Sequence, residues 1–270
     1  MYLIIFIFIF VLYFYLNIIY FYKINPNLEI FEINELNDSL LRFKTPLLFK
    51  LPKESNLTNY TCISYLLKNE SFNNYPFSIN DKIKLPLKII HKYIEKEKKI
   101  SSNNNDFIIN TPDIYKIFKE NDTIFKPILN CSTTTYDIIF GLSETPFKYS
   151  LNYYNYFIIT EGIVDVILTP YTNIPKKERK FDYINMNGGI LSPSNEIKCQ
   201  TIKLKLKKDD VLFIPNFWYY SFRFIDNISS ISSFSYCPIM NDIAILPYHI
   251  LHYLQLQNIK LIPEIISTKK

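Results

Sequence analysis

The sequence is poor in the residues on which several common site chemistries depend. Its 270 residues include four glycines and three histidines, His91, His249 and His252. Four glycines are too few for a glycine-rich nucleotide-binding scheme or a collagen-like repeat. Because there are so few histidines, any site that needs several imidazoles would have to use nearly all of them.

Cysteine is also scarce, and its spacing is wide. Cys62, Cys131, Cys199 and Cys237 form no C-x-x-C pair. Neither a zinc cluster nor a disulfide-framed miniprotein is therefore expected. If the domain faces the cytosol, we expect these thiols to be unpaired and buried.

Apolar and aromatic residues, in contrast, are abundant. Hydrophobic residues make up 48% of the chain and aromatic residues 17%, which excludes a disordered polymer, and the length suits one domain or at most two small ones. The net charge of +5 is modest, and the lysines are spread along separate segments. We therefore expect no nucleic-acid partner.

The N-terminus carries a long apolar run. Residues 2–22 contain no charged residue, and only Asn17 is strongly polar. About 20 helical residues at about 1.5 Å each match the roughly 30 Å hydrocarbon core of a bilayer. A cleaved signal peptide would need a charged start, a shorter apolar core and a small-residue cleavage site, and a pair of core strands would need a turn. We therefore expect residues 1–23 to form an uncleaved transmembrane signal-anchor and the chain to be a single-pass membrane protein, in either orientation.

The rest of the chain is typical of a soluble domain. We expect a linker with an edge strand over residues 24–45, a folded domain over residues 46–260 and a C-terminal tail over residues 261–270. Amphipathic or apolar patterns predict helices at 85–100, 112–118 and 245–256.

From residue 145 onward the pattern changes to strands. Residues 156–160 and 164–168 are rich in strand formers and are joined through Glu161-Gly162, a hairpin signal. Further strands are predicted at 202–207, 211–214, 219–224 and 228–236. Many short strands with helices mostly before and after them indicate a mainly β fold, an antiparallel barrel or sandwich with helical additions.

Two features could serve as sites, and each has a simpler explanation. The basic loop at 176–180 could bind phosphate or lipid head groups, but a solvated loop is favoured. His249 and His252 lie one helical turn apart and could share a metal ion. With no acidic residue or third histidine in that motif, a structural pair is favoured.

Two segments resemble a known family. Residues 210–221 read DVLFIPNFWYYS, which is similar to the GDVLFIPxxWWHS signature of cupin-like, JmjC-type domains. Thr145-Pro146, followed by Asn155 and Gly162, resembles the segment that precedes this signature in the family. The resemblance implies a double-stranded β-helix (cupin or jelly-roll) barrel with flanking helices.

The family signature also assigns structural roles to three residues. Asp210 would turn the chain into a buried strand, and Pro215 would end that strand at the mouth of the barrel. Trp218 would pack across the opening.

A narrower resemblance rests on the N-terminal anchor together with residues 231–260. Both are similar to membrane-anchored cupin-fold proteins encoded by giant nucleocytoplasmic DNA viruses. This resemblance implies a viral protein located in the virion or in a host endomembrane, with other viral membrane or capsid proteins as partners.

The sequence departs from the family at the iron-binding positions. JmjC-type oxygenases hold Fe(II) with an H-x-D/E pair and a distal histidine. Aligned from Thr145-Pro146, the pair falls on Lys148 and Ser150, and counted back from Gly162 it falls on Tyr149 and Leu151. The distal histidine position holds Tyr220, and Val164 stands where the family often has the lysine that grips 2-oxoglutarate.

These replacements predict a pseudoenzyme. A protonated lysine opposes a divalent cation, and neutral tyrosine and serine are poor Fe(II) ligands. We expect no catalytic residue, no metal and no cofactor, and a non-catalytic structural or interaction protein. The alternatives are a 2-oxoglutarate-dependent hydroxylase with non-standard ligands and a binding module for a small apolar or sugar ligand.

A group of tyrosines lies in the segments that would line the barrel mouth. They are Tyr149, Tyr153, Tyr154, Tyr156, Tyr219 and Tyr220. Tyrosine suits recognition surfaces, but we expect most of these residues to belong to the core. For Tyr220 we expect a side chain that points into the former metal pocket.

Overall fold

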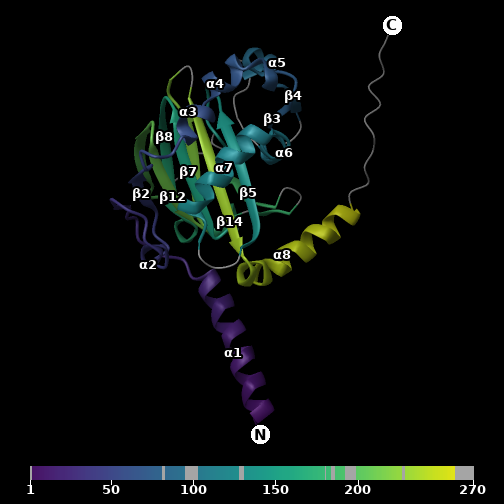
Figure 1. The fold of residues 1–270 in the computed structure, drawn as a ribbon. Coiled ribbons are helices and arrows are strands. Elements are labelled where there is room, and N and C mark those ends of the chain that lie inside the picture. Colours follow the sequence, from purple (N-terminus) through teal and green to yellow (C-terminus); the bar gives the residue numbers. More distant parts are fainter. Residues whose placement is uncertain are drawn as a thin grey trace.

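The computed structural model combines two large sheets with a set of helices (Figure 1). It describes residues 2–80, 83–94, 103–127, 131–179, 181–183, 186–191, 199–226 and 229–258. Of the described residues, 33% are in strands and 40% in helices. The protein is therefore strand-rich, with several sheets, and the helical share is large enough that the mainly β class that we predicted is not clearly shown.

The first sheet has six strands in the order β1-β2-β12-β7-β14-β5. Their bounds are β1 Phe31–Glu32, β2 Leu47–Lys50, β12 Asp210–Pro215, β7 Tyr154–Glu161, β14 Ser230–Pro238 and β5 Cys131–Phe140. Neighbouring strands are antiparallel except β1 and β2, which are parallel.

The second sheet also has six strands, in the order β11-β8-β13-β6-β10-β9. Their bounds are β11 Ile202–Lys207, β8 Ile163–Pro170, β13 Trp218–Phe224, β6 Phe147–Tyr149, β10 Asn187–Leu191 and β9 Phe181–Asp182. A separate hairpin joins β3 Pro76–Asn80 to β4 Ile83–Pro86.

The two sheets share a core formed by the side chains that alternate inward from each. The ring centroid of Phe157 in β7 lies 5.0 Å from that of Tyr220 and 4.9 Å from that of Phe222, both in β13. The same core includes Trp218 and Val164, which are fully buried. Along each of these strands, large apolar side chains at every second position point into the space between the sheets. Each strand therefore contributes one of its two faces to this core.

The turn at Gly162 corrects one prediction. We expected Glu161-Gly162 to close a hairpin, but β7 and β8 lie in different sheets. Each of these strands already has a partner on both sides, so neither has a free edge for the other. Gly162 has φ of 76°, a conformation that suits glycine, and the tight turn carries the chain from one sheet to the other.

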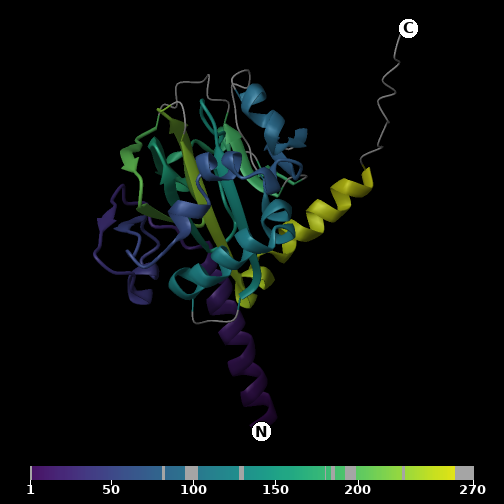
Figure 2. The ribbon, with the colours of Figure 1, turned by 45° about the horizontal axis from the view of Figure 1, so that its top comes forward.

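Three of the helices, α3, α6 and α7, cover the outer face of the first sheet, and α1 and α8 do not (Figures 1 and 2). The helices are α1 Tyr2–Tyr22, α2 Asp38–Leu41, α3 Leu57–Tyr60, α4 Ile63–Lys68, α5 Leu87–Ile94, α6 Asn105–Asn110, α7 Pro112–Phe125 and α8 Ile239–Asn258, with 3₁₀ turns at Glu70–Phe72, Tyr171–Asn173 and Lys176–Glu178. Phe118 and Phe125 of α7 each place their ring centroid 4.9 Å from that of Phe234 in β14. This packing explains why α7 continues to Phe125, beyond the predicted end at residue 118.

Other boundaries also differ from the predictions. The helix expected at 85–100 begins at Leu87, because the residues before it pair with β3; residues 95–100 lie outside the described residues, as do residue 180 of the basic loop, residue 228 and the tail 261–270. The last helix begins at Ile239, six residues before the predicted start.

Helix α1 projects away from the sheets (Figure 1). Within the described residues it is the one helix long and apolar enough to cross a membrane. Its side chains are largely exposed until Phe21, which is fully buried against the domain.

Candidate functional site

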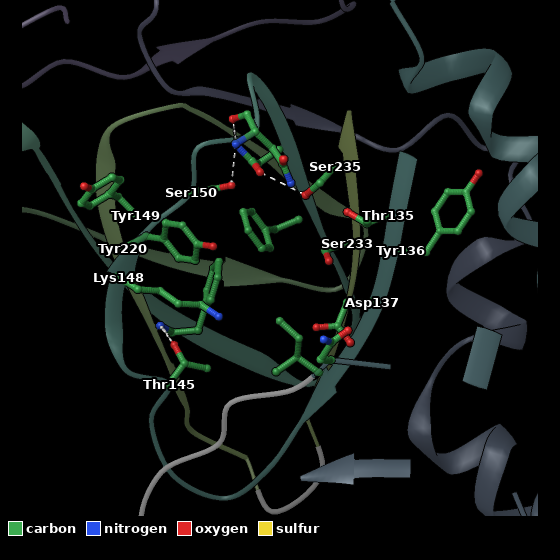
Figure 3. Close-up of a pocket in the computed structure, with 16 residues that line it drawn as sticks. Thr135, Tyr136, Asp137, Thr145, Lys148, Tyr149, Ser150, Tyr220, Ser233 and Ser235 are labelled. Atoms are coloured by element: carbon green, nitrogen blue, oxygen red, sulfur yellow. Dashed lines mark hydrogen bonds between the residues drawn. The ribbon is translucent and has the colours of Figure 1, made fainter. Parts of the chain in front are cut away.

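A cavity of about 240 Å³ lies between the two sheets (Figure 3). Its described lining residues are Asn103, Thr135, Tyr136, Asp137, Ile139, Thr145, Lys148, Tyr149, Ser150, Asn152, Asn155, Phe157, Tyr220, Phe222, Ser233 and Ser235. They come from β5, β7 and β14 of the first sheet, from β6 and β13 of the second, and from the loops that adjoin them. The cavity is thus lined by residues that are far apart in sequence.

Strand alternation explains which side chains reach the cavity. Along β5, Asp137 points into it (Figure 3). The hydroxyl of neighbouring Tyr136 donates instead to Asp122 of α7 at 2.7 Å, on the outer side of the sheet. Successive residues of a strand face opposite sides, so one strand serves both the cavity and the helical layer.

Three of the predicted site residues lie together in the lining of the cavity. Lys148, Ser150 and Tyr220 all line the cavity, and Tyr220 is directly opposite Lys148 in the pairing of β13 with β6. The first of the two motif alignments therefore converges on one place.

The second alignment, which uses Tyr149 and Leu151, does not bring its residues together at the cavity. The ring of Tyr149 is directed away from the cavity centre (Figure 3) and packs 5.3 Å from Tyr171 and 4.9 Å from Tyr219, measured between centroids. A Cβ at Gly188 would lie 2.1 Å from that ring. Leu151 is buried and does not line the cavity.

The cavity contains one cationic and one anionic side chain from the described residues. The side chain of Lys148 points into the space, and Asp137 faces it from β5 (Figure 3). No described residue forms an ion pair or hydrogen bond with the Lys148 ammonium, whereas Asp137 Oδ1 accepts a hydrogen bond from the Asn104 backbone N–H at 2.9 Å. Burial, and then the charge of Asp137, raise the pKa of Tyr220. Tyr220 therefore stays a neutral phenol at physiological pH.

Small polar side chains form another part of the wall. Ser235 donates to Asn155 Oδ1 at 3.0 Å. The Asn155 amide in turn donates to the Asn152 carbonyl at 2.8 Å and to the Ile214 carbonyl at 3.1 Å. Asn155, one of the residues on which the sequence resemblance rests, thus ties the pocket wall to β12.

The remaining signature residues have structural positions. Asp210 pairs with Lys50 at 2.7 Å and accepts from the Lys207 backbone N–H at 2.7 Å, which holds the entrance to β12. Pro215 is the last residue of β12. Trp218 is fully buried in the core between the sheets and does not line the cavity, so it does not pack across the opening as expected.

Sequence reasoning missed part of the site. It did not predict β5, and it did not single out Asp137, Ser233 or Ser235. The available signal was the pattern of small polar residues in CSTTTYDIIF and SISSFSYCP, where polar side chains alternate with residues that pack on α7.

The donor set does not fit Fe(II). Within the described part of the chain no three His, Cys, Asp or Glu residues lie close enough to hold a metal ion. His249 is exposed, and His252 Nδ1 contacts the Tyr183 carbonyl oxygen outside the cavity; the side chain of His91 lies outside the described residues. An ammonium, a serine and a neutral phenol are poor replacements for two imidazoles and a carboxylate.

A second built feature is the junction between α1 and the domain. The buried Lys44 ammonium donates to the carbonyl oxygens of Tyr20 at 2.6 Å, Phe21 at 2.7 Å and Lys23 at 2.9 Å. These carbonyls lie at the end of the helix, where the last acceptors lack the usual amide donor four residues further on and the dipole favours a cation. Burial, and to a smaller degree the charge of Lys23, lower the pKa of Lys44 to about 7.

Aromatic packing completes this junction. The Phe21 ring lies 5.5 Å from Phe217 and 6.5 Å from Tyr153, measured between centroids. Asn216 also donates to the Phe21 carbonyl at 3.1 Å, and the Tyr22 hydroxyl donates to the Ala244 carbonyl at 2.7 Å. The end of α1 is therefore part of the domain core.

Comparison with known proteins does not assign the chain to a family. No family model matches the chain, and no curated protein matches it significantly.

Proposed function

We propose that the chain is a membrane-anchored, non-catalytic interaction protein built on a double-stranded β-helix of the cupin type. In this proposal, a pocket without metal ligands stands at the position where the resembled family binds iron. The protein is a pseudoenzyme without metal or cofactor, in keeping with the family resemblance of its motifs.

The strand order supports the fold assignment. Four neighbouring strands of the first sheet run β12-β7-β14-β5, and four of the second run β11-β8-β13-β6. From β5 to β8 and again from β11 to β14 the chain changes sheet at each connection, whereas β8 to β11 follow one another within the second sheet. Such alternation is typical of an eight-stranded jelly roll, an architecture that includes the cupins.

One observation carries the functional proposal: Lys148, Ser150 and Tyr220 line a single cavity. These are the positions at which the family resemblance would place the iron ligands. A fixed positive charge at this point repels a divalent cation. Among the described residues, the lining then keeps one carboxylate, Asp137, and one carboxylate does not make up a facial triad.

Oxygenase chemistry gives a direct test of this proposal. Detergent-purified full-length protein is incubated with Fe(II), ascorbate and 2-oxoglutarate, and succinate is measured in parallel with bound iron. We expect succinate at the level of a protein-free control and no stoichiometric iron. Succinate formation that depends on the protein and on iron would instead favour the hydroxylase alternative.

A second candidate function is the binding of a small polar ligand. Lys148 presents an ammonium without a partner among the described residues to a cavity whose wall also carries Ser233 and Ser235, beside the aromatic rings of Phe157 and Tyr220. Pockets of this kind hold a ligand by apolar contact and orient it with a few polar groups. A small sugar or sugar acid matches that mixture.

Thermal unfolding tests this second candidate. A ligand that binds the folded state raises the melting temperature in proportion to its occupancy. A panel of neutral sugars and sugar acids should contain a compound that stabilises the wild type and stabilises Lys148→Met less. If no compound in the panel raises the melting temperature, small-ligand binding is contradicted for these compounds, and the non-catalytic interaction role is the better description.

The anchor belongs to the same proposal. We infer that α1 crosses a membrane once and holds the domain at its surface, and that the protein acts in a virion or host endomembrane beside other viral membrane or capsid proteins, as its resemblance implies. Resistance to extraction with alkaline carbonate tests the anchoring step. Release into the soluble fraction would contradict it.

A further inference from the structure

Helix α8 has two faces with different environments. Asn241, Ala244 and Ile245 are buried against the domain, and Tyr248 packs 4.7 Å from Phe181, measured between ring centroids. With His252, which contacts the Tyr183 carbonyl oxygen, these residues recur at the spacing of one helical face. This face docks α8 on the domain, where it meets the ends of β14 and β5 as well as β9 and the residue that follows it.

The opposite face is apolar and exposed. It is formed by Ile239, Ile243, Leu246, Ile250, Tyr253 and Leu254. Their spacing of three or four residues places them in one continuous stripe. Ile250 is 52% exposed and Leu246 is 53% exposed, which is unusual for a row of large apolar side chains on a surface facing water.

The helix also lacks charge along most of its length. After Asp242 in its first turn, residues 243 to 258 include no Asp, Glu, Lys or Arg, and His249 and His252 are the titratable side chains besides the tyrosines. A solvent-exposed helix is expected to carry charged residues on its outer face. The stripe therefore has the composition of a buried surface.

The place of α8 relative to α1 indicates what covers the stripe. The hydrogen bond from the Tyr22 hydroxyl to the Ala244 carbonyl joins the last residue of α1 to the beginning of α8. From this point α8 runs across the direction of α1 rather than beside it (Figures 1 and 2). If α1 crosses a bilayer, α8 starts at the level where α1 leaves it and extends to one side, at an oblique angle that a tilt of α1 would bring toward the bilayer surface (Figures 1 and 2).

We propose that the exposed stripe of α8 inserts into the interface of the same bilayer that α1 spans. This inference rests on the proposed anchoring role of α1. Apolar side chains of an in-plane helix reach about 5–10 Å into the boundary between head groups and acyl chains. Because α8 has no lysine or arginine, its insertion depends on apolar contact and not on anionic lipid.

Lipid-borne quenchers test the insertion face by face. The full-length protein is reconstituted into phosphatidylcholine vesicles that contain dibrominated acyl chains, and tryptophan fluorescence is recorded for Ile250→Trp and Gln255→Trp. Both positions are exposed, but they face opposite sides of the helix. The native Trp218 is fully buried between the sheets and serves as the unquenched reference in each sample.

We expect several-fold stronger quenching of the tryptophan at position 250 than of that at position 255, with no change between low and high salt. Equal quenching of the two variants, or quenching of neither, would overturn the proposal, and so would a concentration-dependent dimer that disappears in Ile250→Ser. Flotation of the same vesicles separates this result from the anchoring step. Protein that floats without quenching at position 250 contradicts the role of α8 alone, whereas protein that does not float contradicts the anchor.

Discussion

At the scale of single residues, Asp122 connects the helical layer to the first sheet. Its carboxylate accepts from the Tyr136 hydroxyl at 2.7 Å and from the Tyr236 hydroxyl at 2.8 Å, and it pairs with Lys119 at 3.1 Å. Both tyrosines are buried. One carboxylate thus satisfies polar groups from β5 and β14 that have no access to water.

Removing this carboxylate should be costly. Asp122→Ala leaves two buried hydroxyls without acceptors, and we expect a loss of about 3 kcal/mol in the free energy of unfolding. Glu120→Ala, on the same helix, removes only the exposed pair with Lys116 at 3.9 Å and should cost less than about 0.5 kcal/mol. Denaturant titration of both variants measures the difference, and comparable losses would show that Asp122 has no special role.

Lys44 gives a second prediction at this scale. The pKa of its ammonium falls from 10.5 to about 7 on folding, so between these values the unfolded chain binds more protons than the folded one. The free energy of unfolding should therefore rise with pH, by up to about 1.4 kcal/mol per unit. Below pH 7 both states are protonated, and this contribution is constant.

The comparison is best made between pH 7 and 9, below the range in which tyrosines titrate. The difference in unfolding free energy between wild type and Lys44→Met should grow over this interval in detergent solution. A difference that stays flat would mean that the three carbonyl acceptors and the nearby aromatic rings keep Lys44 charged in the folded protein.

At the scale of elements, α1 consists of two parts with different surroundings. Residues 2–16 are exposed over nearly their whole length, whereas Phe21 is buried against Tyr153 and Phe217. Crossing a membrane and docking on the domain therefore depend on different residues of the same helix.

Two deletions separate these roles. Loss of residues 2–16 should abolish resistance to carbonate extraction and leave the melting temperature in detergent nearly unchanged. Loss of residues 2–22 should also lower the melting temperature, because Phe217 becomes exposed and Lys44 loses carbonyl acceptors. Equal melting temperatures for the two shortened chains would contradict the docking role of Phe21.

Local pattern predicted several elements well, and the exceptions have physical reasons. The strand at 202–207 alternates strictly and was placed without error. The run CSTTTYDIIF of β5 has three adjacent threonines and was missed, because its alternation appears only once α7 is known to cover one face. The Glu161-Gly162 turn was assigned to a hairpin because a local pattern does not say which sheet the next strand joins.

At the scale of the whole molecule, the candidate site was predictable only in part. Lys148, Ser150 and Tyr220 were found because they occupy defined positions in a motif, and the fold brings them together. Asp137 was not found, since an isolated carboxylate in a strand carries no sequence signal. The contact of α8 with the end of α1 joins segments more than 200 residues apart in the chain, and no local pattern predicts it.

Metal binding tests most directly the idea that this pocket has lost its iron site. Fe(II) and Zn²⁺ affinity is measured by equilibrium dialysis for full-length wild type and for the triple variant Lys148→His/Ser150→Asp/Tyr220→His, which restores an H-x-D pair and a distal histidine to one cavity wall. We predict no stoichiometric metal in the wild type and about one ion per chain in the variant, as expected for a facial triad. One tightly bound ion in the wild type, released by a chelator and lost in Tyr220→Phe, would contradict the proposal.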